Sequence, residues 1–259
     1  MDHTTRELRL ATALVEAADT LTEGFRAADH LQRVADHCVE LLAARAVGFM
    51  LVDGGRTVSL AGSSRQEAVA LDLLTAQQDG GPCVESCGSG KQVRPVSIRA
   101  AHADARWPDF TQRALGYDIA ETFAVPLRRG GTLLGALNVF VPTGSAGACE
   151  NGASELPVTQ ALADATAVGL QNHRTYTQYR TLTDQLQEAL SSRIRIEQAK
   201  GMLAERWHIG ADEAFAALRQ YARRRRLPLK QVAQAVIERV ADDDELQREA
   251  SRPPSGRSS

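Results

Sequence analysis

Apolar residues recur at helical spacing near the start of the chain, which predicts two helices at residues 5–20 and 27–44. Two pairs of short apolar runs follow, and a glycine-containing turn separates the runs of each pair. This pattern predicts two β-hairpins, one at residues 46–61 and one at residues 121–141. Helices before and between two hairpins predict an α+β fold, in which helices pack on an antiparallel sheet.

The second half of the chain has a helical pattern. After a loop of small residues at 143–153, helical spacing continues with few interruptions from Pro157 to about Arg206. A helix this long that is only half apolar usually joins domains or pairs with a copy of itself. Residues 212–225 and 228–240 predict two further helices with one apolar face each, and together with the end of the long helix they predict a three-helix bundle.

Charge divides the chain in the same place. Residues 184–240 carry a formal charge of +4, residues 1–183 carry −4, and the whole chain of 259 residues carries −2. An acidic body joined to a basic bundle indicates two domains with different tasks. Residues 241–259 are polar and end in a segment rich in Pro and Ser, so we expect a disordered tail there.

Composition excludes several classes of protein. With 43% apolar and 24% charged residues, the chain is typical of a globular protein. No apolar run approaches the ~18 residues of a membrane helix, and the first residues lack the layout of a signal peptide, so we expect a cytoplasmic protein. Glu85 stands where a phosphate-binding loop needs glycine, and no cluster has the spacing of a zinc site. We therefore expect no metal, no cofactor and no enzymatic activity.

The basic bundle carries motifs of a known family. The run Ser192–Leu203 resembles the opening of an ANTAR domain, the RNA-binding module of transcription antitermination regulators. The similarity continues through Asp212–Phe215, Leu218-Arg219, Ala222-Arg223 and Val232-Ala233. It implies a regulator that binds stem–loops in nascent RNA.

The N-terminal part resembles a GAF domain, a sensor fold with a central antiparallel sheet. The resemblance depends on five short motifs: Gly81-Pro82-Cys83, Gly90-Lys91, Trp107–Phe110, Ala124–Leu127 and Leu134–Val139. Their order is similar to that of actinobacterial regulators that join GAF to ANTAR. The two resemblances imply a sensor domain at residues 1–175, which would bind a small molecule, and an RNA-binding domain with a connecting coiled-coil helix at 176–240. They also imply a homodimer.

Basic residues of the bundle are the candidate RNA ligands. Arg193 and Lys200 lie seven residues apart and share a helix face, and Arg219 and Arg223 lie one turn apart on the next helix. By resemblance, these four fall on the family's recurrent basic positions. Tyr221 is a candidate for stacking on an unpaired base. The alternative is a solvated basic face, in which the arginines also favour the helix C-terminus.

Four residues of the sensor part are candidates for redox chemistry or ligand binding: Cys83, Cys87, Trp107 and Phe110. The two cysteines follow Gly-Gly-Pro, where a short helix would begin, and a helix N-terminus lowers the pKa of a thiol. This favours a thiol redox sensor or an enzyme similar to methionine sulfoxide reductases as the alternative function. The opposing interpretation is that the thiols and the aromatic rings only pack in the core.

Overall fold

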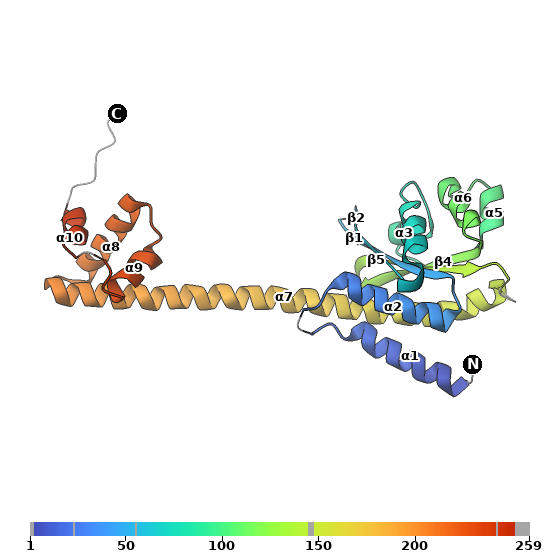
Figure 1. The fold of residues 1–259 in the computed structure, drawn as a ribbon, viewed down its shortest axis with the longest axis horizontal. Coiled ribbons are helices and arrows are strands. Elements are labelled where there is room, and N and C mark those ends of the chain that lie inside the picture. The colour runs from blue at the N-terminus through green and yellow to red at the C-terminus, as the bar shows by residue number, and fades with distance from the viewer. Residues whose placement is uncertain (1–2, 23, 55, 145–147, 242, 252–259) are drawn as a thin grey trace, which may run out of the picture. The chain divides into compact units, whose positions relative to one another are not determined.

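The chain folds into two units, Met1–Thr177 and Gln178–Ser259 (Figure 1). The computed structural model describes residues 3–22, 24–54, 56–144, 148–241 and 243–251. Within these residues, no helix has the length and apolar character needed to cross a membrane.

An antiparallel sheet forms the centre of the first unit, with five strands in the described part of the chain in the order β2-β1-β5-β4-β3. Both predicted hairpins are present, and the predicted α+β class is confirmed. The hairpin strands are β1 (Ala46–Asp53) with β2 (Arg56–Gly62), and β4 (Ile119–Arg129) with β5 (Thr132–Pro142). The fifth strand, β3 (Val93–Ser97), was not predicted and pairs with β4 at the edge of the sheet.

Helices cover both faces of this sheet. On one face, α2 (Ala27–Leu42) and the first part of α7 (Ala148–Trp207) pack on the sheet, and α1 (His3–Ala18) packs against α2. The other face is covered by shorter elements. These are η1 (Ser64–Gln66), α3 (Glu67–Thr75), α4 (Pro82–Ser89), α5 (Ile98–Ala103) and α6 (Pro108–Gly116). Each face encloses its own cluster of buried side chains, so the unit has three layers.

Gly135 permits the close pairing of the central strands. Its φ is +156°, and a Cβ at this position would lie 2.1 Å from the carbonyl oxygen of Met50 on β1. A side chain cannot be accommodated there without moving the backbone. Glycine at position 135 is therefore needed for β5 to pair closely with β1.

Helix α7 begins earlier than the pattern predicts. We expected a loop at 143–153 and a helix from Pro157, whereas the helix starts at Ala148. Residues 145–147 of the predicted loop lie outside the described residues. Tertiary contacts hold these first turns, since Leu156 is buried on the sheet and Glu155 forms an ion pair with Arg6 of α1. Small residues were therefore a poor indicator of a loop.

The second unit contains the C-terminal half of α7, α8 (Ala211–Arg225) and α9 (Leu229–Ile237), the three helices that the pattern predicts. Their apolar faces meet in one buried cluster. It includes Ala199 and Leu203 of α7, Ala214 and Leu218 of α8, and Val232 and Val236 of α9. Burial of the small side chains allows the helices to approach closely.

The expectation of a disordered tail from residue 241 is wrong for part of that segment. A further helix, α10 (Asp243–Ser251), packs against α8, and Leu246 is fully buried in the cluster of the bundle. One large apolar residue in a polar segment gives no periodic pattern, so the sequence did not predict this helix. Residues 252–259 lie outside the described part of the chain.

Candidate nucleic-acid interface

Two of the candidate RNA ligands lie on α7. Arg193 is exposed, whereas Lys200, two helical turns later, is half-buried. The Lys200 ammonium forms an ion pair with Glu197 on the same helix. The ion pair with Glu197 must therefore break before Lys200 can bind RNA phosphate, whereas Arg193 is exposed to solvent.

The other two basic candidates lie on α8, one turn apart, and both Arg219 and Arg223 are exposed. The guanidinium carbon of Arg219 lies 5.8 Å from the centroid of the Phe215 ring, within the range of a cation–π contact. This contact steadies the side chain, which remains exposed. A planar guanidinium suits both phosphate oxygens and base edges, so α8 presents two groups of the right chemistry.

Tyr221 also lies on α8, but its ring is half-buried and packs against the core of the bundle. The guanidinium carbon of Arg225 lies 5.7 Å from its ring centroid. Part of the ring surface is therefore already in contact with protein. Stacking of Tyr221 on an RNA base stays a prediction.

The candidate thiols do not have the expected electrostatics. Cys83 is fully buried in helix α4 and Cys87, one turn later, is half-buried against the same cluster; both are free thiols. Burial raises the pKa of Cys83 well above its usual value, and the neighbouring Cys87 raises it further, while a hydrogen bond with Asn138 acts in the opposite direction. Burial also raises the pKa of Cys87 to about 11. The expected lowering at the helix N-terminus is wrong because burial withdraws both thiols from the water that would solvate a thiolate.

The aromatic candidates pack together beside α6. Phe110 is fully buried, with its ring centroid 6.1 Å from that of Trp107 and 6.2 Å from that of Phe140. The Arg106 guanidinium covers the half-buried Trp107 ring at 4.0 Å. These contacts place both rings in or against the core of the sheet face, and a ligand-binding role for them stays a prediction.

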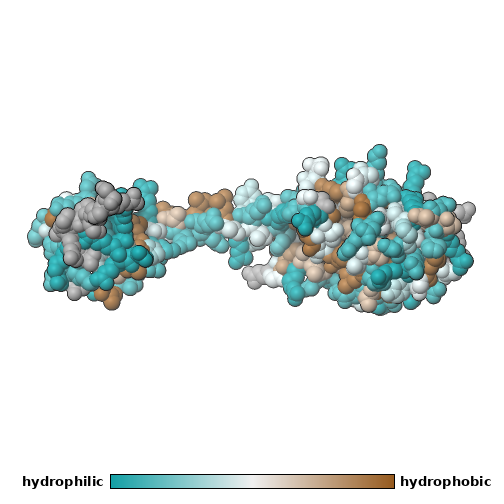
Figure 2. All heavy atoms as spheres, turned by 90° about the horizontal axis from the view of Figure 1, so that it is seen from above, coloured by the Kyte–Doolittle hydropathy of each residue, from teal (hydrophilic) through white to brown (hydrophobic). Residues whose placement is uncertain are grey.

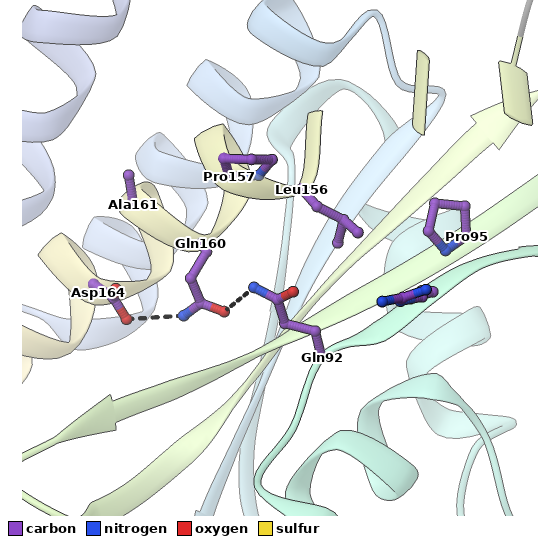
Figure 3. Close-up of a pocket in the computed structure, with 8 residues that line it drawn as sticks. Gln92, Pro95, Leu156, Pro157, Gln160, Ala161 and Asp164 are labelled. Carbon is purple, nitrogen blue, oxygen red and sulfur yellow. Dashed lines mark hydrogen bonds between the residues drawn. The ribbon is translucent and has the colours of Figure 1, made fainter. Parts of the chain in front are cut away.

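A groove that the sequence did not predict lies between the start of β3 and helix α7 in the first unit (Figure 3). Its volume is about 610 Å³, and its walls include Gln92, Arg94 and Gln160. The Gln92 amide donates to Gln160 Oε1 at 3.0 Å, and the Gln160 amide donates to Asp164 Oδ1 at 2.8 Å. The groove continues past Lys91 and Arg128. Its polar lining comes from segments far apart in sequence, so only the fold reveals it.

Comparison with known protein families gives one match. Residues 184–237 match the ANTAR domain, and this range runs from the exposed part of α7 to the last residue of α9. The four basic candidates, Arg193, Lys200, Arg219 and Arg223, all lie within it. Helix α10 lies outside it. None of the curated proteins matches the chain.

Solved structures of low sequence identity resemble the chain over about two thirds of its length. A free methionine-R-sulfoxide reductase from Neisseria meningitidis is 18% identical, with 66% of this chain and 95% of that chain covered and a TM-score of 0.43. The A. aeolicus nlh2 GAF domain is 14% identical, with 64% and 98% covered and a TM-score of 0.44. A GAF domain from a Coxiella burnetii phosphoenolpyruvate-protein phosphotransferase is 17% identical, with 69% and 99% covered and a TM-score of 0.42. With TM-scores below 0.5, these similarities assign neither a ligand nor an activity to the chain.

Proposed function

We propose that this chain, which carries an ANTAR domain at residues 184–237, is a signal-responsive, RNA-binding regulator of transcription antitermination. In this proposal the ANTAR domain binds stem–loops in nascent RNA and prevents a terminator from forming. The N-terminal unit is a GAF-type sensor of a small molecule. The observation that carries the proposal is the match of the basic helical bundle to the ANTAR domain.

The exposed arginines of the bundle support RNA binding on physical grounds. Arg193, Arg219 and Arg223 are exposed. Within the residues that the structure describes, none of the three forms an ion pair. Each can therefore bind phosphate without first losing a protein carboxylate. Neutralising phosphates releases counterions, so the affinity for RNA falls as salt is raised.

The direct test is RNA binding by the full chain. The probe is a labelled RNA with two stem–loops in tandem, compared with duplex DNA of equal length at two salt concentrations. We expect Arg219→Ala with Arg223→Ala to weaken RNA binding about tenfold or more and to reduce the salt slope by roughly 1–2. The control Arg174→Ala with Arg180→Ala removes two exposed arginines of α7 outside the matched range and leaves affinity nearly unchanged. Equal, weak binding to RNA and DNA in all three proteins overturns the proposal.

A second copy of the chain is the proposed partner of the exposed part of α7. Every side chain from Tyr176 to Ser191 is exposed, and apolar side chains gather on this stretch (Figure 2). The larger ones are Tyr176, Tyr179, Leu182, Leu186 and Leu190, and Ile194 follows them on the helix; each is at least 49% exposed. Spacings of three and four residues form the seam of a coiled coil, which buries this apolar area between two helices.

Substitutions that introduce charge into the seam test whether the chain is a dimer. We expect Leu182→Glu with Leu186→Glu to convert a dimer into a monomer in size-exclusion chromatography with light scattering. Thr181→Glu places a charge on the opposite side of the same helix and should leave the dimer intact. A wild-type chain that is monomeric at micromolar concentration contradicts this part of the proposal.

The fold of the first unit supports the sensor part of the proposal. The antiparallel sheet with helices on both faces agrees with the expected sensor fold. Helix α7 packs on the sheet through Leu162, Ala163 and Ala167 and then continues into the ANTAR range, so a change at the sheet acts on the helix directly. The thiol alternative has weaker support, since neither Cys83 nor Cys87 is a thiolate at neutral pH.

A further inference from the structure

Helix α10 adds an acidic segment to the basic bundle. Its nine residues, Asp243–Ser251, contain four acidic residues and one arginine. The helix begins after the last residue of the ANTAR match at position 237. It packs on α8, whose last three residues and C-cap form a block of four arginines, Arg223 to Arg226 (Figure 1). The most acidic helix of the unit therefore lies on its most basic one.

An apolar anchor holds α10 in this position. Leu246 is fully buried, in the same cluster as Leu218 and Ala222 of α8. The neighbouring Asp244 and Glu245 are at least partly exposed. The helix thus has Leu246 in the core, while Asp244 and Glu245 lie at the surface of the bundle.

The acidic face contacts the arginine block directly. The Glu245 carboxylate forms an ion pair with the Arg225 guanidinium, and both side chains are about two-fifths exposed. The same guanidinium lies near the Tyr221 ring. Arg225 is therefore paired with a carboxylate and lies near a ring, whereas in the described part of the chain neither Arg219 nor Arg223 on the same helix forms an ion pair.

We propose that α10 is an intramolecular acidic ligand of the arginine block, and that Glu245 competes with RNA phosphate for Arg225. The inference rests on the proposed function, because it assigns a competitor to the same RNA-binding surface. A carboxylate and a phosphate oxygen use the same N–H donors of a guanidinium. RNA gains Arg225 as a contact only when Glu245 leaves it, so α10 lowers the affinity of the resting protein for RNA.

The test is a double-mutant cycle on the full chain, with the tandem stem–loop RNA as the probe. Glu245→Gln removes the competing charge and leaves Leu246 in place, so circular dichroism should show an unchanged fold. We expect it to tighten RNA binding about threefold, the factor typical of an exposed ion pair, and to steepen the salt slope by up to ~1. In an Arg225→Ala background, the same substitution should have a much smaller effect.

The matched control is Glu205→Gln, which removes an exposed carboxylate from α7 in the same bundle. Glu205→Gln and Glu245→Gln with equal effects would mean that any loss of negative charge on the bundle strengthens RNA binding, and this result overturns the inference. An effect of Glu245→Gln that is undiminished in the Arg225→Ala background overturns it for the same reason. Unchanged affinity in Glu245→Gln overturns it as well. RNA binding that is absent from every variant and from wild type refutes the proposed function itself, and the inference with it.

Discussion

Gly169 lies where α7 crosses the end of α1, and its replacement by alanine tests how tightly the long helix is held in the first unit. A Cβ at this position would lie 2.5 Å from the carbonyl oxygen of Ala17 and 2.8 Å from Cγ2 of Thr20. The Thr20 hydroxyl also donates to the Gly169 carbonyl at 2.6 Å. The methyl group would therefore force α1 and α7 apart.

Two terms of opposite sign decide the result. Alanine stabilises a helix by ~1 kcal/mol relative to glycine. Overpacking against backbone costs about 1–3 kcal/mol. We expect Gly169→Ala to lower the free energy of unfolding of the first unit by about 0–2 kcal/mol. Gly201→Ala, on the same helix, places its Cβ in open space and should raise the free energy of unfolding of the second unit by up to ~1 kcal/mol.

The two tryptophans allow each unit to be followed separately. Trp107 lies in the first unit and Trp207 in the second, so a Trp→Phe substitution of either leaves one fluorescent reporter in urea unfolding. The predicted difference between the two glycine substitutions is about 1–3 kcal/mol, the cost of the close approach. If both substitutions stabilise their units equally, the α1–α7 packing described above is wrong.

Three further predictions concern buried groups. The first uses a Cys149→Ser background, so that Cys149 does not contribute to the reaction. In this background Cys87 should react with a disulfide reagent at pH 7.5 about 30-fold more slowly than free cysteine does. Its rate should rise with pH towards the pKa of about 11, and fast reaction at neutral pH would contradict this. Burial lowers the pKa of His30 below 6.5, so the unfolded state binds more protons and the free energy of unfolding should fall as pH drops below about 6.5. His30→Gln should remove this part of the pH dependence, measured by urea unfolding at pH 7.5 and 5.5, and an unchanged dependence would refute it. Leu246→Ala should destabilise the second unit by about 2–4 kcal/mol, followed by Trp207 fluorescence, and a loss near zero would show that α10 does not dock.

Local patterns predicted the elements with strong periodicity and clear turns. Both hairpins, α2, α8 and α9 follow from alternation or helical spacing bounded by glycine or proline. The strand β3 could not be predicted in this way. It has five residues with Pro95 in the middle, and it is a strand because β4 offers it a partner.

The candidate site shows the same division. The sequence identified basic residues of the right chemistry, and the structure places Arg193, Arg219 and Arg223 in solvent. It did not indicate that Lys200 pairs with Glu197 or that Glu245 of α10 pairs with Arg225, since such contacts arise from the packed bundle. The thiol pKa values also depend on tertiary burial, which spacing alone does not reveal.

The central claim is that the bundle acts on transcription through RNA, and a termination assay tests it most directly. Single-round transcription through a terminator preceded by two stem–loops gives the fraction of full-length transcript with and without the protein. Wild type should increase readthrough, and Arg219→Ala with Arg223→Ala should lose most of this increase. Arg174→Ala with Arg180→Ala should retain it. Readthrough that is unchanged by wild type in the presence of bound RNA, or increased equally by the α8 variant, would contradict the account.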